Sequence, residues 1–137
     1  MATVNISSNG TRYGQDISIR DFQLIADEPQ DIGGDDRGAT PMEYVLAGLG
    51  ACKAITIRMY AERKGWQLEK VDVQVDYERS QKKPVVQAKL VIEGDLDQAQ
   101  RERLKAIGDR CPVHRFLSEQ IIIETTLSES QNVEETF

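Results

Sequence analysis

The chain has 137 residues and a formal net charge of −6, from 17 basic and 23 acidic side chains. That length suits one domain, which is large enough to bury roughly two-thirds of the surface that the unfolded chain exposes. The acidic balance, with no basic stripe, excludes a protein that binds nucleic acid by neutralising its phosphates.

The start of the chain predicts a cytoplasmic protein with no membrane partner. Residues 1–6 do not combine a charged region with an apolar run, as a signal peptide would. The apolar stretch at 42–57 contains Glu43 and Lys53 and is too short for a membrane span. Structural disulfides are rare in the cytoplasm, so a dithiol pair there would be catalytic or redox-sensing.

Three short strands and a loop are expected in the N-terminal part, 1–39. Apolar and polar residues alternate around positions 4–6 and 17–19, and a third strand is expected at 22–26. Tight connections between them predict an antiparallel meander. The acidic segment 27–39 contains a proline and a glycine pair and lacks the ligand spacing of a calcium loop, which favours a solvated loop.

A long central helix is predicted over 40–64. Thr40 is a good N-cap, Pro41 is favoured at the first helical position, and Glu43 completes a capping box. Gly65 is the expected C-terminal stop. The first half of this helix is apolar on nearly all sides, which predicts burial all round. One small domain can hardly surround such a rod, so we expect a second subunit to cover it.

The remaining strands and the C-terminal helices are expected in 68–127. The predicted elements are strands at 71–77, 86–92 and 121–127, a helix capped at Asp97 and running to about Arg110, a helical turn starting at Pro112, and a polar tail at 128–137. This order indicates the α+β class, with antiparallel sheets packed around the long helix. We expect a single domain over 1–137.

The two cysteines lie in different local settings. Cys52 lies in an apolar, small-residue stretch of the predicted helix, where a thiol is usually buried and inert. Cys111 precedes Pro112 at a helix start, which favours negative charge, so the local sequence predicts the more acidic thiol there. Together the two would form a dithiol/disulfide pair. With His114 they would supply only three zinc ligands without short-range spacing, so we expect no metal and no cofactor.

The segment from Gly38 to Cys52 resembles the osmotically inducible protein C / organic hydroperoxide resistance (OsmC/Ohr) family. The preceding loop, 26–34, the downstream phrase Cys111-Pro-Val-His114 and the element order extend the match over nearly the whole chain. The resemblance implies an OsmC-like fold in an intertwined homodimer, with the long helices at the centre and the cysteine pairs near the subunit interface.

The same resemblance implies a thiol peroxidase for organic hydroperoxides. Cys52 would be the peroxidatic thiolate, which attacks the O–O bond, releases an alcohol and becomes a sulfenic acid. Cys111 would be the resolving thiol, which condenses with that sulfenic acid to a disulfide. A dithiol reductant, in the family often a lipoyl group, would restore both thiols by exchange.

The chain departs from the peroxidase branches directly after Pro41. Those branches carry a glutamate at this position, whereas this chain has Met42, with Glu43 one residue later. One residue rotates a side chain by about 100° around a helix, so Glu43 need not reach the same site. Its role as the capping-box partner of Thr40 is the favoured interpretation.

The cation that would activate Cys52 is left open by the sequence. Arg12 is the nearest counterpart by order along the chain, and the other candidates are Arg37, Arg58, Arg110 and Arg115. His114 could act as a proton shuttle near Cys111, but a local hydrogen-bonding role is favoured. The alternative function is a non-enzymatic, dimeric OsmC-like protein that senses redox state or binds a hydrophobic small molecule.

Overall fold

The computed structural model describes residues 2–79 and 82–128 and divides the chain into two compact units. The second unit is Val45–Ile121, and the first combines the residues before it with those after it. The predicted tail, 128–137, lies outside the described residues except for Ser128. The single domain over 1–137 stays a prediction, and the two units are described separately.

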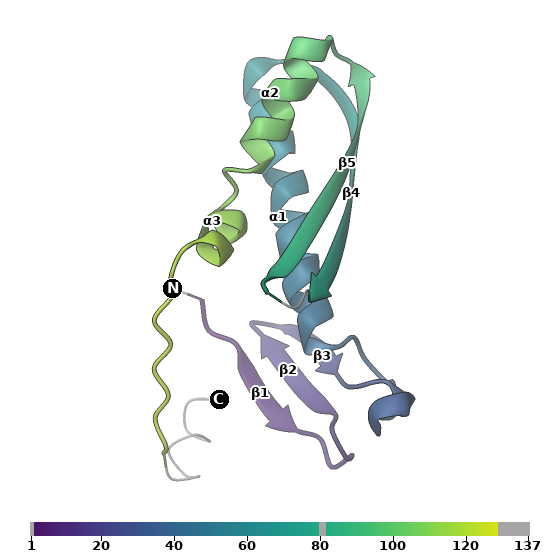
Figure 1. Cartoon of the computed structure of the whole chain (residues 1–137), viewed down its shortest axis with the longest axis vertical. Coiled ribbons are helices and arrows are strands. Elements are labelled where there is room, and N and C mark those ends of the chain that lie inside the picture. The colour runs from purple at the N-terminus through teal and green to yellow at the C-terminus, as the bar shows by residue number, and fades with distance from the viewer. Residues whose placement is uncertain (1, 80–81, 129–137) are drawn as a thin grey trace. The chain divides into compact units, whose positions relative to one another are not determined.

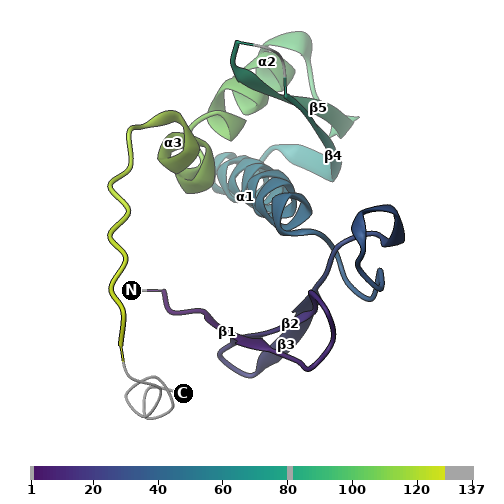
Figure 2. The same ribbon diagram turned by 60° about the horizontal axis from the view of Figure 1, so that its bottom comes forward.

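The first unit contains the predicted antiparallel meander (Figure 2). Its strands are β1 (Asn5–Ser8), β2 (Gln15–Ile19) and β3 (Phe22–Ala26), in the order β1-β2-β3. Ile6 pairs with Ile17, which in turn pairs with Leu24, so that apolar side chains share one face. That face is poorly covered within the chain, because Ile6 is 52% and Phe22 59% exposed.

The acidic loop is organised by its first carboxylate. Asp27 is buried, and its side chain accepts hydrogen bonds from the backbone N–H groups of Glu28 (2.7 Å) and Arg37 (3.2 Å). The bond from Arg37 connects the beginning of the loop to its end, whereas the bond from Glu28 is local. A single 3₁₀ turn, η1 (Gln30–Ile32), lies between them. The segment is a loop as predicted, but Asp27 belongs to its interior.

A long hairpin and two helices accompany the central helix in the second unit (Figure 1). The elements are α1 (Pro41–Lys64, which begins in the first unit), β4 (Gln67–Arg79), β5 (Pro84–Asp95), α2 (Gln98–Gly108) and α3 (Pro112–Ser118). The core is made by Ile57 and Ala61 of α1, Leu68 of β4 and Leu104 of α2. The α+β class, with antiparallel sheets and a long helix, is confirmed.

Local signals place the helix ends as predicted. Gly65 adopts a left-handed φ of +69° directly after α1, a conformation that glycine reaches without steric cost. Asp97 caps α2 in a complete capping box, in which its carboxylate accepts from the N–H of Gln100 and the Gln100 side chain accepts from the N–H of Asp97. Among the described residues, no helix is both long and apolar enough to cross a bilayer.

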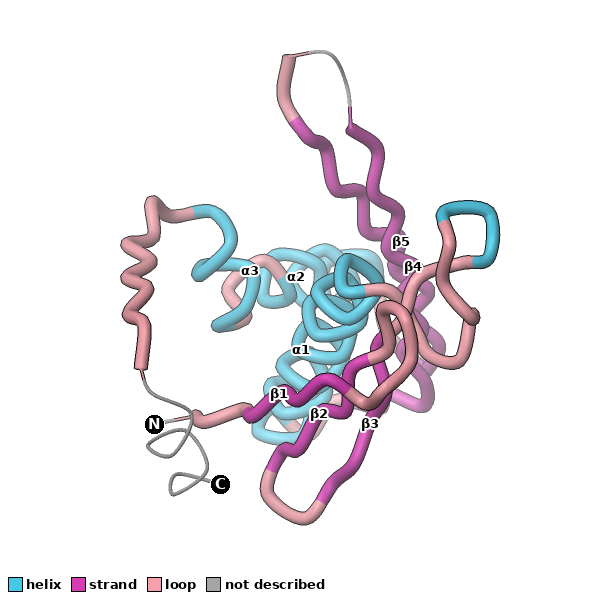
Figure 3. Tube along the Cα trace, turned by 90° about the horizontal axis from the view of Figure 1, so that it is seen from below, coloured by secondary structure: helices cyan, strands magenta, loops and turns pink. Residues whose placement is uncertain are grey.

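The helix α1 is partly exposed in the single chain, where Val45, Ile55 and Met59 are 42%, 55% and 61% exposed. The expected burial of its first half with the help of a second subunit stays a prediction. One other expectation is wrong for the single chain. The strand expected at 121–127 is absent: residues 120–128 are a loop (Figure 3), and Ile122 is 85% exposed. An apolar, β-branched run forms a strand only when a neighbouring strand completes its backbone hydrogen bonds, and none of the described strands does so.

Candidate functional site

The structure brings the two predicted cysteines together. Both are free thiols in the second unit. Cys52 is half-buried in the middle of α1, whereas Cys111 is completely buried and is the N-cap of α3. The side chain of Cys52 is close enough to Cys111 to contribute to the raised pKa of the Cys111 thiol. The pair expected from the sequence is therefore present as two adjacent thiols.

The close approach of α2 to α1 positions Cys111. Gly108, the last residue of α2, has no side chain, and a Cβ there would lie only 3.1 Å from the Ile57 side chain of α1. The next residues stay tightly wound, since the N–H of Arg110 donates to the carbonyl of Ile107 at 2.9 Å. Pro112 then starts α3 with its fixed φ. The chain thus turns from α2 into α3 directly beside Cys52.

Cys111 is not the acidic thiol that the local sequence predicts. Burial raises the pKa of Cys111, since the thiolate would lose its hydration, and the neighbouring Cys52 thiol raises this pKa further. The backbone N–H of His114, which donates to the Cys111 sulfur at 3.3 Å, and the charge of Lys53 lower the pKa but do not reverse the shift. A helix of seven residues provides too little field to outweigh the loss of water.

Lys53 is a cation whose charge acts on Cys111, and the sequence reasoning missed it by considering arginines alone. Its side chain is only 4% exposed. The three ammonium protons have three acceptors: the carbonyl of Gly108 at 3.2 Å, the carboxylate of Asp109 at 3.1 Å and Nδ1 of His114 at 2.8 Å. A lysine directly after Cys52, in an otherwise apolar helical stretch, was the available signal.

His114 connects Lys53 to Cys111. Because a lysine ammonium only donates, Nδ1 of His114 must accept, which assigns the ring proton to Nε2. The same residue donates its backbone N–H to Cys111. Oδ1 of Asp109 lies 3.8 Å from Nδ1 of His114 and only 3.1 Å from the ammonium nitrogen of Lys53, so its ion pair is with Lys53. Within 2–79 and 82–128, no three acidic, histidine or cysteine side chains are grouped as metal ligands.

A pocket of about 450 Å³ opens beside this cluster. Lys53, Asp109 and His114 contribute its polar side, and Leu49 of α1 and Leu117 of α3 contribute apolar surface. The pocket is therefore shaped for a molecule with an apolar part, close to the residues that surround Cys111.

Two of the arginines considered from the sequence, Arg58 and Arg12, have other partners. Arg58 donates to the carbonyls of Leu68 (2.7 Å) and Glu69 (3.1 Å), which joins α1 to β4. Arg12 belongs to the first unit, where its guanidinium lies 4.9 Å from the centre of the Tyr13 ring.

Glu43 is the capping-box partner of Thr40, as the favoured interpretation predicted. The carboxylate of Glu43 accepts from the backbone N–H of Thr40 at 2.8 Å, and the Thr40 hydroxyl accepts from the N–H of Glu43 at 3.2 Å. The bond from the Thr40 backbone is the main cause that lowers the pKa of Glu43. The carboxylate is thus engaged at the start of α1.

We expect Thr40→Ala to lower the free energy of unfolding by about 1 kcal/mol, the usual cost of losing an N-cap. Glu43→Gln should destabilise less and in a pH-dependent way. Because the folded pKa of Glu43 is depressed, its stabilisation is present above the unfolded pKa and is lost as the pH falls through the folded pKa. Urea titrations at neutral and acidic pH should show that the free energy of unfolding of Glu43→Gln differs from that of the wild type at neutral pH and approaches it in acid. A constant difference would contradict this role.

The comparisons with known proteins agree with this architecture. A family model described as OsmC-like protein matches residues 33–126. The chain is similar to a putative osmotic stress induced and detoxification response protein from Psychrobacter arcticus, at 16% identity and a TM-score of 0.73, over 85% of this chain and 88% of that one. A search of the curated proteins found no match.

Two further solved structures have the same fold. An OsmC like protein from Mycoplasma pneumoniae is 21% identical with a TM-score of 0.72, over 86% of this chain and 87% of that one. An organic hydroperoxide resistance protein OsmC from Legionella pneumophila is 22% identical with a TM-score of 0.63, over 85% and 88% of the two chains. At these identities, the likeness to the solved structures establishes the fold.

Proposed function

Because the chain belongs to the OsmC-like protein family, we propose that it is a thiol-dependent peroxidase that reduces organic hydroperoxides. The observation that carries the proposal is the adjacency of two free thiols of unequal exposure. A half-buried Cys52 can meet a peroxide, whereas a fully buried Cys111 is kept protonated until its neighbour is oxidised. The hydroperoxide resistance protein from Legionella pneumophila has the same fold, which supports the assignment.

The cycle has three balanced steps. The Cys52 thiolate attacks the peroxide oxygen, the O–O bond breaks, and the alcohol leaves with a proton while Cys52 becomes a sulfenic acid. The Cys111 sulfur then attacks the Cys52 sulfur, and the hydroxyl leaves as water with the Cys111 proton. An external dithiol reduces the resulting disulfide by two exchange steps and is itself oxidised to a disulfide. A lipoyl-type dithiol is the proposed reductant.

Lys53 assists the steps in which Cys111 carries charge. Its ammonium lowers the pKa of Cys111 and is held in place by three hydrogen bonds. The thiolate of Cys111 develops when it attacks the sulfenic acid and again when it leaves during reduction of the disulfide. A fixed cation at this position stabilises both states without first having to be ordered.

The active form in this proposal is a homodimer. Three apolar surfaces are uncovered in one chain: the stripe through Val45 and Ile55 of α1, the sheet face that includes Phe22, and the loop that includes Ile122. Exposed apolar side chains that gather on one element are typical of a subunit interface. A second copy is the partner that supplies matching surfaces and that could complete the backbone hydrogen bonds of 121–127.

Mass spectrometry after a stoichiometric pulse of cumene hydroperoxide tests the proposal. The reduced protein should lose two hydrogens from one chain, and peptide mapping should find Cys52 and Cys111 joined in a single intramolecular disulfide. A chain that stays unchanged, or one that gains oxygen at Cys52 while Cys111 remains a free thiol, would sink the two-thiol cycle.

A second candidate is a redox sensor without sustained turnover. This candidate is favoured by the position after Pro41, where the peroxidase branches have a glutamate and this chain has Met42. Glu43 does not take over that role, because its carboxylate is engaged in the capping box. Both candidates form the disulfide, so the reduction step separates them. A peroxidase consumes many equivalents of hydroperoxide in the presence of a dithiol, whereas a sensor consumes one.

A further inference from the structure

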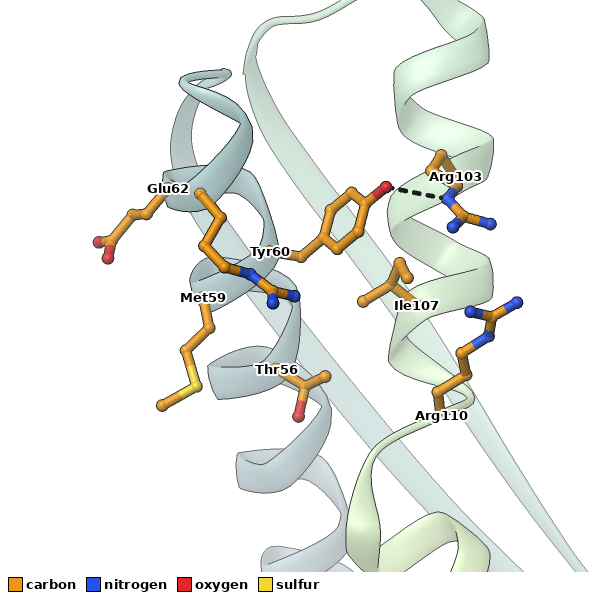
Figure 4. Close-up of a pocket in the computed structure, with 8 residues that line it drawn as sticks. Thr56, Met59, Tyr60, Glu62, Arg103, Ile107 and Arg110 are labelled. Atoms are coloured by element: carbon orange, nitrogen blue, oxygen red, sulfur yellow. Dashed lines mark hydrogen bonds between the residues drawn. The ribbon is translucent and has the colours of Figure 1, made fainter.

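A second, larger groove lies between α1 and α2 (Figure 4). Its volume is about 790 Å³, which is within the range of small-molecule sites in proteins. Met59 and Thr56 line it from α1, and Ile107 lines it from α2. Thr56 lies one helical turn after Cys52, but neither cysteine is part of the lining, so this groove is separate from the thiols.

Three arginines line this groove in a protein whose net charge is −6. Arg63 comes from α1, Arg103 from α2, and Arg110 from the residues that follow α2. None of the three forms an ion pair with any described residue. Glu62 is the only acidic residue in the lining. A local excess of guanidinium groups in an acidic protein marks a place where an anion is attracted.

Tyr60 arranges the arginines at one end of the groove. Nε of Arg103 donates a hydrogen bond to the Tyr60 hydroxyl (Figure 4), with a donor–acceptor distance of 3.1 Å. The guanidinium of Arg63 lies 5.7 Å from the centre of the Tyr60 ring. Tyr60 also packs edge-on against Trp66, with ring centres 5.6 Å apart. The fork of Arg103 is thus oriented through Nε, while its terminal nitrogens have no hydrogen-bond partner among the described residues, which suits the bidentate binding of a carboxylate.

We infer that the groove between α1 and α2 binds an amphipathic carboxylate, with its head on the arginines and its apolar chain along Met59 and Ile107. A singly charged head fits better than a phosphate dianion, since the lining comes from the C-terminal halves of both helices, where the helix dipole disfavours negative charge. This site goes beyond the proposed peroxidase function and does not depend on it, because binding needs no thiol chemistry.

Titration of the full-length, reduced protein with decanoate tests the inference, with the fluorescence of Trp66 and calorimetry as two readouts. Trp66 is the only tryptophan and contacts Tyr60, so occupancy of the groove should change its emission. We expect one saturable site. Decanol, which has the chain without the charge, and acetate, which has the charge without the chain, should each bind at least about tenfold more weakly.

Substitutions should assign that site to the arginines. Arg103→Gln and Arg110→Gln should each weaken decanoate binding at least about tenfold, since each removes charge-assisted hydrogen bonds to the carboxylate. Lys105→Gln is the matched control: it removes the same charge from α2 at a residue that lines a different pocket, and it should change the affinity less than about twofold. Tyr60→Phe keeps all three arginines but removes the hydrogen bond that orients Arg103, so it should weaken decanoate binding, though less than Arg103→Gln does.

Several outcomes would overturn the inference. Equal binding of decanol and decanoate would show a purely apolar groove, and tighter binding of decyl phosphate would assign the arginines to a phosphate. If decanoate does not bind and Arg103→Gln instead shifts the monomer–dimer equilibrium in sedimentation, the groove is covered by a second copy. Because no peroxide is present, each of these results leaves the peroxidase proposal standing.

Discussion

Replacing Cys52 by serine is expected to abolish the reduction of organic hydroperoxides, with a loss of at least about 10³-fold in kcat. A serine hydroxyl stays protonated at neutral pH and forms no sulfenic acid, so the first bond cannot be made. Cys111→Ser should still reduce one equivalent of hydroperoxide and then stop, because the sulfenic acid on Cys52 has no neighbouring thiol. Single-turnover and steady-state assays with a dithiol reductant separate the two results.

Cys52→Ser and Cys111→Ser can be compared directly, because each replaces one thiol by a hydroxyl. Both serines are nearly isosteric with cysteine, and urea titration should show that each variant remains folded. Turnover by Cys52→Ser at a rate close to that of the wild type would exclude Cys52 as the peroxidatic residue. Undiminished steady-state turnover by Cys111→Ser would show that the external dithiol reduces the sulfenic acid directly. Cys111 would then not be the resolving thiol.

The fold was most predictable where a few neighbouring residues decide the structure. The capping pairs Thr40 with Glu43 and Asp97 with Gln100, and the stop at Gly65, depend on contacts within one helical turn, and all three are present. Alternating patterns predicted the meander and the long hairpin for the same reason, since side-chain direction along a strand depends on the strand alone.

Predictions failed where the outcome depends on residues far away in the chain. The last strand was expected from the β-branched run at 121–127, but a strand needs a partner, and the described chain offers none. Cys111 was expected to be acidic from its position before Pro112, but that position does not determine how deeply the sulfur is buried, and burial raises its pKa. In each case the local signal was read correctly and a long-range effect outweighed it.

Lys53 was missed for a related reason. Its three partners are 55, 56 and 61 residues away in sequence, so no window along the chain contains them. The useful signal was an inconsistency: a lysine in an apolar stretch of a central helix needs buried acceptors, because an unpaired buried charge is costly. Asking which residues could supply them would have directed attention to the segment around Cys111.

The second large effect is expected for Lys53→Met, which keeps much of the side-chain volume and removes the charge. The carbonyl of Gly108 loses its hydrogen bond from Lys53 in a buried setting, so the free energy of unfolding should fall by about 1–3 kcal/mol. The pKa of Cys111 should rise further, since Lys53 is one of the two groups that lower it. Urea titration measures the first effect, and the pH dependence of disulfide formation measures the second.

The pH profile distinguishes an electrostatic role from a structural one. Because the pKa of Cys111 is already raised in the fold, its thiolate fraction increases only towards alkaline pH, and removing Lys53 should move the rise in the rate of disulfide formation to still higher pH. At neutral pH we expect about a tenfold slower step, which corresponds to about 1.4 kcal/mol of lost charge stabilisation. Lys105→Met, which removes an exposed charge from α2, should leave the profile in place. A slower step with an unshifted profile would mean that Lys53 only supports the packing around Cys111.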